Sequence, residues 1–159
     1  MASDAIFLDQ LLAAVAAVRL DVIVVGNVAS ILHGAPVTTQ DIDLLIRDTP
    51  LNRKKLVALA KALRLTPPEP ISDVTRTLRM SGAAAPVDFL LDQIGGGLKF
   101  TSVKARAVRI RVDEQTAVVA SLEDVIESKQ AANRPKDRAM LPILRDTLRI
   151  KKALAAKEK

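Results

Sequence analysis

Two aspartates stand at the start of an apolar, strand-like segment, and this arrangement constrains the chain more than any other feature. Asp41 and Asp43 are separated by Ile42 and followed by the wholly apolar residues 44–46. Side chains alternate across a strand, so both carboxylates project from one face, about 7 Å apart along the backbone. A strand that is apolar on both faces is typical of the centre of a sheet, which places the acids at its mouth.

A third acid, Asp88, lies in a second apolar run at residues 86–91. Two like charges 4 Å apart repel by roughly 4 kcal/mol at an effective dielectric near 20, so gathered carboxylates need a cation. Oxygen ligands suit Mg²⁺ (or Mn²⁺), and two such ions can clamp the reacting oxygens of a phosphoryl transfer. The pattern predicts a metal site at Asp41, Asp43 and Asp88. The alternative is that Asp41 caps a turn while the other two lie in solvent.

Helices and strands are expected in mixed order, with strands in the middle of the chain and helices at both ends. Hydrophobic spacing and turn residues predict a helix over residues 11–18, a strand at 22–25, a short helix at 28–33, a strand at 41–46, a helix at 51–63, strands at 74–80, 87–91, 104–112 and 117–119, a helix at 122–132 and a last helical region opened by Pro135. The fold class is therefore α/β (α+β), with a mixed central sheet flanked by helices and a helical C-terminal part.

Local signals fix several of these boundaries. Thr49 followed by Pro50 is typical of a helix start, and residues 121–124 resemble a capping box. The glycines at 95–97 lack the Lys-Ser/Thr of a P-loop and are interpreted as a connection between strands. Proline removes a backbone donor, so Pro142 is expected to kink or divide the last helix.

Composition indicates one domain over residues 1–159, with a core from about 10 to 120 and a helical region at 121–159. Hydrophobic residues make up 49% of the chain, and the absence of cysteine excludes thiol catalysis, Cys-ligated zinc and disulfides. Asp4 and Asp9 precede the first apolar segment, which argues against a secretory signal. No run approaches the roughly 18 apolar residues of a membrane span, so we expect a cytoplasmic protein.

The charge balance favours a polyanionic partner. The chain carries 24 Lys and Arg against 18 Asp and Glu, a formal net charge of +6. Contacts to phosphates dominate nucleic-acid affinity, so RNA is a candidate partner, and a basic solvated surface is the equal alternative. With three Phe, no Trp and no Tyr, the chain has little with which to stack unpaired bases.

The order of these motifs resembles the nucleotidyltransferase superfamily of the polymerase-β type. Residues 22–46, VIVVGNVASILHGAPVTTQDIDLLI, resemble its strand, Gly turn, short helix ending in His-Gly and Asp-x-Asp strand, which a later single acid follows. The closest subgroup is that of small bacterial domains related to abortive-infection and toxin–antitoxin nucleotidyltransferases. The resemblance covers about residues 10 to 148 and is carried by Gly26, His33, Gly34, Asp41, Asp43, Asp88, Lys129, Arg134, Lys136 and Asp137.

The resemblance implies roles for these residues. Asp41 and Asp43 would hold the metal ions, and Asp88 would share a metal and help to activate an acceptor hydroxyl. The amides of Gly26 and Asn27 would approach the triphosphate of a nucleoside triphosphate (NTP). The other candidates for nucleotide binding are Thr39, Lys129, Arg134 and Lys136. Lys129 is also a candidate catalytic residue.

Two departures from the family pattern leave a non-catalytic interpretation open. Asn27 stands where Gly or Ser is usual, although its amide can still donate to phosphate. Val37 stands where relatives commonly place Arg before the acidic strand. Loss of that cation would weaken phosphate binding or change the substrate.

Lys129 and His33 can also be interpreted from the sequence alone. Lys129 shares a helical face with the apolar residues 122, 125 and 126, so its ammonium must reach solvent or find an anion. That anion would be a phosphate or a site aspartate. His33 is the only histidine, which excludes His-pair metal motifs. Beside Gly34 it is expected to pack or to cap a helix.

These observations predict a metal-dependent enzyme that moves a nucleoside monophosphate from an NTP to an acceptor hydroxyl. The acceptor would be RNA, such as the tRNA acceptor end, or a protein, and a cognate antitoxin is a candidate partner. One alternative is a catalytically degenerate module of the same fold that binds nucleotide, nucleic acid or a partner protein. Another is a phosphodiesterase that uses the same acids.

Overall fold

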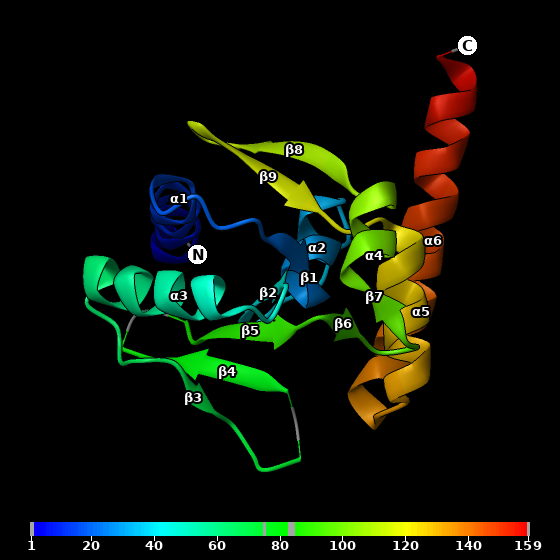
Figure 1. The fold of residues 1–159 in the computed structure, drawn as a ribbon. Coiled ribbons are helices and arrows are strands. Elements are labelled where there is room, and N and C mark those ends of the chain that lie inside the picture. The colour runs from blue at the N-terminus through cyan, green and yellow to red at the C-terminus, as the bar shows by residue number, and fades with distance from the viewer. Residues whose placement is uncertain (1, 75, 83–84, 159) are drawn as a thin grey trace.

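The computed structural model describes residues 2–74, 76–82 and 85–158. Over these residues a seven-stranded sheet has the order β3-β4-β5-β2-β1-β9-β8. Its strands in chain order are β1 (Ile23–Val25), β2 (Ile42–Ile46), β3 (Glu69–Pro70), β4 (Thr77–Met80), β5 (Val87–Leu91), β8 (Val108–Val112) and β9 (Gln115–Val119). The sheet is mixed, because β2 is antiparallel to β1 but parallel to β5. This confirms the predicted sheet type (Figure 1).

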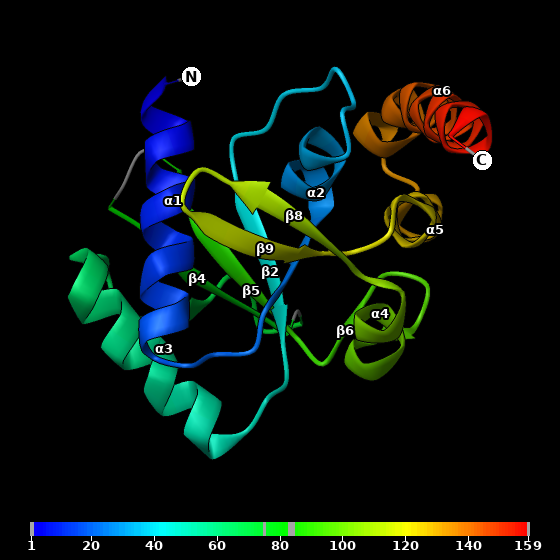
Figure 2. The same ribbon diagram turned by 90° about the horizontal axis from the view of Figure 1, so that it is seen from above.

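Helices cover both faces of this sheet. Figure 2 shows α1 (Ala2–Ala17) and α3 (Pro50–Leu63) on one side and α2 (Gly26–Leu32) on the other. The helix α5 (Leu122–Ala132) packs against α2, and α6 (Pro135–Lys157) packs against α5. The central strand β2 is apolar and buried from Leu44 to Ile46, so the sheet core follows directly after Asp41, just before the strand, and Asp43, its second residue.

The predicted helix starts are confirmed by their caps. The Thr49 hydroxyl accepts a hydrogen bond from the amide of Asn52 at 3.0 Å, and Pro50 is the first residue of α3. The Ser121 hydroxyl accepts from the amide of Asp124 at 3.1 Å, and α5 begins at the next residue. Each cap satisfies an amide that the first helical turn would otherwise leave without a partner.

The strand predicted for residues 104–112 is wrong in its first part. Residues Phe100–Arg106 form the helix α4, and β8 begins only at Val108. Phe100 and Val103 are both buried, three residues apart, which is a helical spacing. The alanines at 105 and 107 alternate as in a strand, but alanine also favours a helix. Alternation at these two positions therefore did not distinguish a strand from a helix. The 95–97 glycines do connect strands, namely the short pair β6 (Gln93–Ile94) and β7 (Leu98–Lys99).

Three smaller boundaries also differ from the prediction. The helix α2 begins at Gly26 itself, and not after a separate turn. The strand β4 begins at Thr77, whereas the prediction began at 74 and included residue 75, which lies outside the described residues. The helix α6 is not divided at Pro142. Leu141 and Leu144 are buried on α6, and burying two leucines offsets the about 3 kcal/mol that an interior proline costs.

A search of the described helices for a membrane-spanning segment found none of sufficient length and apolarity.

Candidate functional site

A cleft of about 650 Å³ lies between the mouth of the central strands and the helices α5 and α6. All nine residues that the sequence predicted for metal or nucleotide binding line this one cleft: Gly26, Asn27, Thr39, Asp41, Asp43, Asp88, Lys129, Arg134 and Lys136. They come from four separate segments of the chain. One wall carries the three aspartates, and the opposite wall carries the three basic residues.

The pairing of β2 with β5 brings two aspartates together. The strands are parallel, and their register sets Asp43 directly opposite Asp88. Asp88 is 5% exposed, while Asp43 is half-buried. Asp41 lies one residue before β2, and its backbone is fixed by Thr39, whose hydroxyl donates to Asp41 O at 2.8 Å and accepts from Asp41 N at 3.2 Å. In this structure Thr39 therefore positions the first aspartate.

Gly26 lies directly behind Asp43. Its φ is +66°, a left-handed conformation that side chains other than glycine rarely adopt. A Cβ at this position would overlap Oδ2 of Asp43 and would lie 3.2 Å from its Cγ. Both the backbone conformation and the close approach therefore require glycine at the junction between β1 and α2.

Arg79 is the residue of this site that sequence reasoning missed. It lies on β4, where the antiparallel register sets it opposite Asp88. Its Nε donates to Asp88 Oδ1 at 2.7 Å, and its Nη2 donates to Asp88 Oδ2 at 2.9 Å. The same Nη2 lies 3.6 Å from Oδ2 of Asp41. Two of the three predicted metal ligands therefore already share one cation, and it belongs to the protein.

Asp43 has no such partner. Among the described residues no cation forms an ion pair with it, and the nearby charges of Lys129 and Arg134 act on it only at longer range. Burial, together with the negative charges of Asp88 and Asp41, raises the pKa of Asp43 to about 6. The ionised form of Asp43 is therefore disfavoured, and a bound cation would stabilise it.

These residues fit a divalent ion held together with a phosphate. Within the described residues, no three His, Asp or Glu side chains are arranged to hold a metal ion by themselves. Asp41 and Asp43 nevertheless offer carboxylate oxygens at the mouth of the cleft, and Mg²⁺ typically takes one or two carboxylates plus substrate phosphates. The donor set suits Mg²⁺ or Mn²⁺ bound with a nucleotide.

Lys129 crosses the cleft from α5 to the start of α2. It is 8% exposed, and its ammonium donates to Oδ1 of Asn27 at 2.6 Å. Oδ1 of Asp137 lies 3.8 Å from the same ammonium. Burial lowers the pKa of Lys129, and Asp137 opposes that effect. The predicted inward orientation is confirmed, but the contacts of the ammonium are Asn27 and Asp137, and no site aspartate is among its ion pairs.

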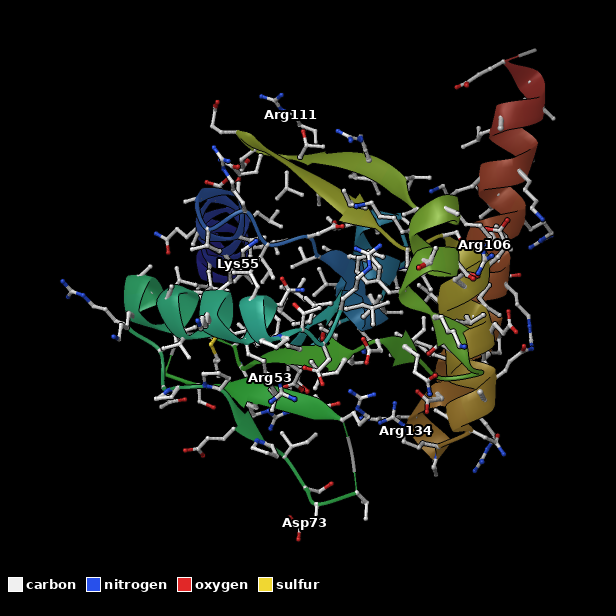
Figure 3. All side chains as sticks on the ribbon, viewed as in Figure 1. Arg53, Lys55, Asp73, Arg106, Arg111 and Arg134 are labelled. Atoms are coloured by element: carbon white, nitrogen blue, oxygen red, sulfur yellow. The ribbon has the colours of Figure 1, made fainter. Side chains whose placement is uncertain are left out.

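The start of α6 is built around Asp137. This carboxylate is 1% exposed and accepts from the backbone N of Arg134 at 3.1 Å and from its Nε at 2.6 Å. Figure 3 shows Arg134 at the start of α6, on the side of that helix that faces β4 and β5. Asp137 thus forms ion pairs with both Arg134 and Lys129, and Lys136 lines the same cleft.

His33 lies away from this site and is structural, as expected. Its Nε2 bonds to the carbonyl of Ala120 at 2.7 Å, and its Nδ1 bonds to the ammonium of Lys151 at 2.5 Å. A carbonyl only accepts, so Nε2 carries the proton and Nδ1 accepts from the ammonium. Gly34 follows with φ +99°, a left-handed conformation that is typical of the glycine after a helix.

Solved structures with this architecture were found by comparison. The crystal structure of ANT(2'')-Ia in complex with adenylyl-2''-tobramycin matches with a TM-score of 0.65 at 14% identity, over 98% of this chain and 99% of that chain. The solution structure of the antibiotic-resistance factor ANT(2'')-Ia gives 0.61 at 12% identity, over 99% and 97% of the two chains. An antigenic nucleotidyltransferase-like protein from Paracoccidioides brasiliensis gives 0.59 at 15% identity, over 94% and 77%. No family model matches the sequence, and no curated protein does. The chain therefore shares its fold with these structures, which include a nucleotidyltransferase-like protein.

Proposed function

We propose that this chain is a metal-dependent nucleotidyltransferase, which moves a nucleoside monophosphate from an NTP to an acceptor hydroxyl and releases pyrophosphate. One observation carries the proposal: a single cleft sets Asp41, Asp43 and Asp88 on one wall and the basic side chains of α5 and α6 on the other. A metal-bound triphosphate has this distribution of charge, with a cation at one end and phosphate oxygens along its length. The shared fold and the adenylyl-2''-tobramycin complex of ANT(2'')-Ia support the same reaction class.

In this proposal the acidic residues of the cleft bind the metal ion, and the basic residues bind the triphosphate. Asp41 and Asp43 hold Mg²⁺ or Mn²⁺, which when bound neutralises developing charge on the phosphates. Lys129, Arg134 and Lys136 bind the triphosphate from the other wall. Gly26 and Asn27 line the same cleft at the start of α2, and in this proposal their backbone amides donate to phosphate oxygens.

The transfer exchanges one phosphorus–oxygen bond for another. The acceptor oxygen attacks the α-phosphorus, and the bond to the bridging oxygen of the pyrophosphate breaks. Asp88 accepts the proton of the hydroxyl. A carboxylate has about four lone-pair sites, and the two hydrogen bonds from Arg79 leave the others free for the hydroxyl.

RNA is the acceptor that the charge of the chain favours, because a net charge of +6 attracts a polyanion. A protein hydroxyl is the other acceptor we consider. A cytoplasmic toxin–antitoxin role with a cognate antitoxin protein belongs to the same proposal, on the resemblance of the motifs alone.

The test is label transfer from two forms of each NTP. Wild-type protein with Mg²⁺ and total RNA is incubated with NTP labelled at the α-phosphate or at the γ-phosphate. Nucleotidyl transfer places only the α-label on RNA or protein. Asp43→Asn should abolish it, while Asp146→Asn, an exposed residue of α6 whose ion pair is with Arg149, should leave it unchanged. Transfer of the γ-label, or hydrolysis with no labelled acceptor, would contradict the proposal.

A second candidate function is a nucleotide-binding module without transfer. The Arg79 contacts favour it, because they engage both oxygens of Asp88. NTP binding that depends on Mg²⁺, with no labelled product from any acceptor fraction, is the result that distinguishes it.

A further inference from the structure

We infer that Arg79 stands in for a second divalent ion, so that the cleft binds a single ion at Asp41 and Asp43 while Asp88 is kept out of the metal site. This inference rests on the proposed function, since it concerns how the same cleft holds a metal-bound nucleotide. It gives Arg79 the role of a positioning residue.

The geometry of β4 and β5 fixes this cation in place. Arg79 and Asp88 are cross-strand partners, so their side chains leave the sheet on the same face. Both oxygens of Asp88 accept from the guanidinium, at 2.7 and 2.9 Å. The contact to Asp41 at 3.6 Å makes the guanidinium a bridge between two of the three carboxylates. A metal ion shared by Asp41 and Asp88 would need to occupy this position.

The guanidinium is held more firmly than a surface ion pair. A guanidinium stays charged at every pH that a protein tolerates, and a bidentate pair is stronger and more directional than a single charged hydrogen bond. Asp88 is 5% exposed, so removing its partner would leave a buried charge uncompensated. The hydrogen bond to Asp88, and then the negative charge of that carboxylate, raise the pKa of Arg79 above its usual value.

The position beside Asp43 is the one left for an ion. Asp43 has no ion-pair partner among the described residues, and Asp41 is engaged by Arg79 only at the longer distance of 3.6 Å. Two carboxylates with phosphate oxygens and water satisfy Mg²⁺. The three aspartates are thus balanced by one fixed guanidinium and one exchangeable ion.

The experiment counts bound Mn²⁺ by electron paramagnetic resonance, with the full chain and the α,β-methylene analogue of each NTP in turn. Two ions in a shared site lie about 3.5–4 Å apart and give a spin-coupled spectrum, whereas one ion gives an uncoupled spectrum. We expect the wild-type protein to bind one Mn²⁺ per chain without coupling. Arg79→Met should bind two with coupling, because it exposes the Asp88 carboxylate.

Arg79→Lys tests whether the positive charge at this position is what keeps the second ion out. The ammonium keeps the positive charge beside Asp88, so this variant should bind one Mn²⁺ like the wild type. In wild-type protein Asp88→Asn should leave the count at one, because Asp88 is not a ligand, and in the Arg79→Met background it should return the count from two to one. Arg109→Met, on β8 outside the cleft lining, is the matched control and should bind one.

The outcomes separate this inference from the proposed function. Two coupled ions in wild-type protein overturn the role of Arg79 and leave the proposed function standing. An unchanged count of one in a folded Arg79→Met variant also overturns that role alone. No bound Mn²⁺ in wild-type protein overturns both. If Arg79→Met does not fold, the wild-type count and the Asp88→Asn count still decide the question.

Discussion

The ammonium of Lys129 donates a hydrogen bond to Oδ1 of Asn27, a residue 102 positions earlier in the chain, at 2.6 Å. This bond joins the last turn of α5 to the first turn of α2, and both residues line the cleft. It gives Asn27 a structural role at the start of α2. The amide side chain holds the buried ammonium where a triphosphate would meet it.

Removing the acceptor should therefore destabilise the chain. Asn27→Ala leaves the Lys129 ammonium, 8% exposed, without its nearest acceptor, and an unsatisfied buried group costs about 1–3 kcal/mol. Lys129→Met keeps the length of the side chain without its charge. In urea unfolding, the double variant should lose less stability than the sum of the single variants. Additive losses would mean that the two side chains do not interact.

The stability of the wild-type chain should fall as pH rises through the titration of Asp43. Its pKa is near 3.8 when unfolded and about 6 when folded, so the folded state holds the proton more tightly. The loss in the free energy of unfolding caused by ionised Asp43 is absent below about pH 4. It is fully present above about pH 6, where it reaches up to about 3 kcal/mol. Asp43→Asn should thus be more stable than wild type by about 1–3 kcal/mol at pH 7.5.

Denaturant unfolding at pH 7.5 and at pH 4 checks this sign. The advantage of Asp43→Asn should shrink toward zero at the lower pH. Added Mg²⁺ should stabilise wild-type protein at pH 7.5 and have little effect on the variant. If the stability advantage of Asp43→Asn over wild type were smaller at pH 7.5 than at pH 4, the prediction would be wrong.

Gly26→Ala should lower both the stability of the chain and its affinity for nucleotide. A residue with a Cβ at φ +66° costs roughly 1–2 kcal/mol, and the new methyl group must displace the Asp43 carboxylate. We expect a lower melting temperature together with at least about a tenfold loss of nucleotide affinity, which corresponds to 1.4 kcal/mol. Gly97→Ala tests the backbone effect alone, because its φ is +67° and its Cβ would meet no atom within 4 Å. That control should lose stability and keep its affinity.

His33 should titrate below the ordinary value of 6.5. Burial lowers its pKa most, the bond to Ala120 opposes that effect, and the charge of Lys151 lowers the pKa further. Because the neutral form is favoured in the folded state, this residue contributes stability above pH 6.5 that is lost as pH falls below it. It is the only histidine, so its Hε1 resonance can be followed by NMR without assignment.

Lys151→Gln tests the assigned contact. Removing the ammonium should move the Hε1 midpoint of His33 to higher pH, while Lys152→Gln, the neighbouring lysine, should change it less. An unchanged midpoint in Lys151→Gln would show that the bond from Lys151 to Nδ1 is not formed in solution.

The acidic half of the site could be predicted because its signal is local. Asp41 and Asp43 precede an apolar strand, and Asp88 precedes another, so each residue carries its own context in the sequence. Arg79 has no such signal. Its side chain matters only because β4 pairs with β5 in a register that sets it opposite Asp88, and strand pairing depends on residues far from the arginine.

The same limit applies to the rest of the fold. The caps at Thr49 and Ser121 were predictable, because a cap depends on residues three positions apart. The helix α4 was not, since a seven-residue segment such as FTSVKAR fits a strand or a helix until its neighbours decide which residues are buried. The role of Asp137 as the anchor of Arg134 and Lys129 likewise depends on how α6 packs against α5.

The central claim is that the cleft binds a nucleoside triphosphate through a divalent ion on Asp41 and Asp43. Calorimetric titration with each NTP, with Mg²⁺ or with EDTA, tests it most directly. We predict that one NTP binds wild-type protein with Mg²⁺, that EDTA or Asp43→Asn weakens this binding by at least about tenfold, or 1.4 kcal/mol, and that Asp146→Asn leaves it unchanged. Equal binding with and without the ion, or full affinity in Asp43→Asn, would contradict the claim.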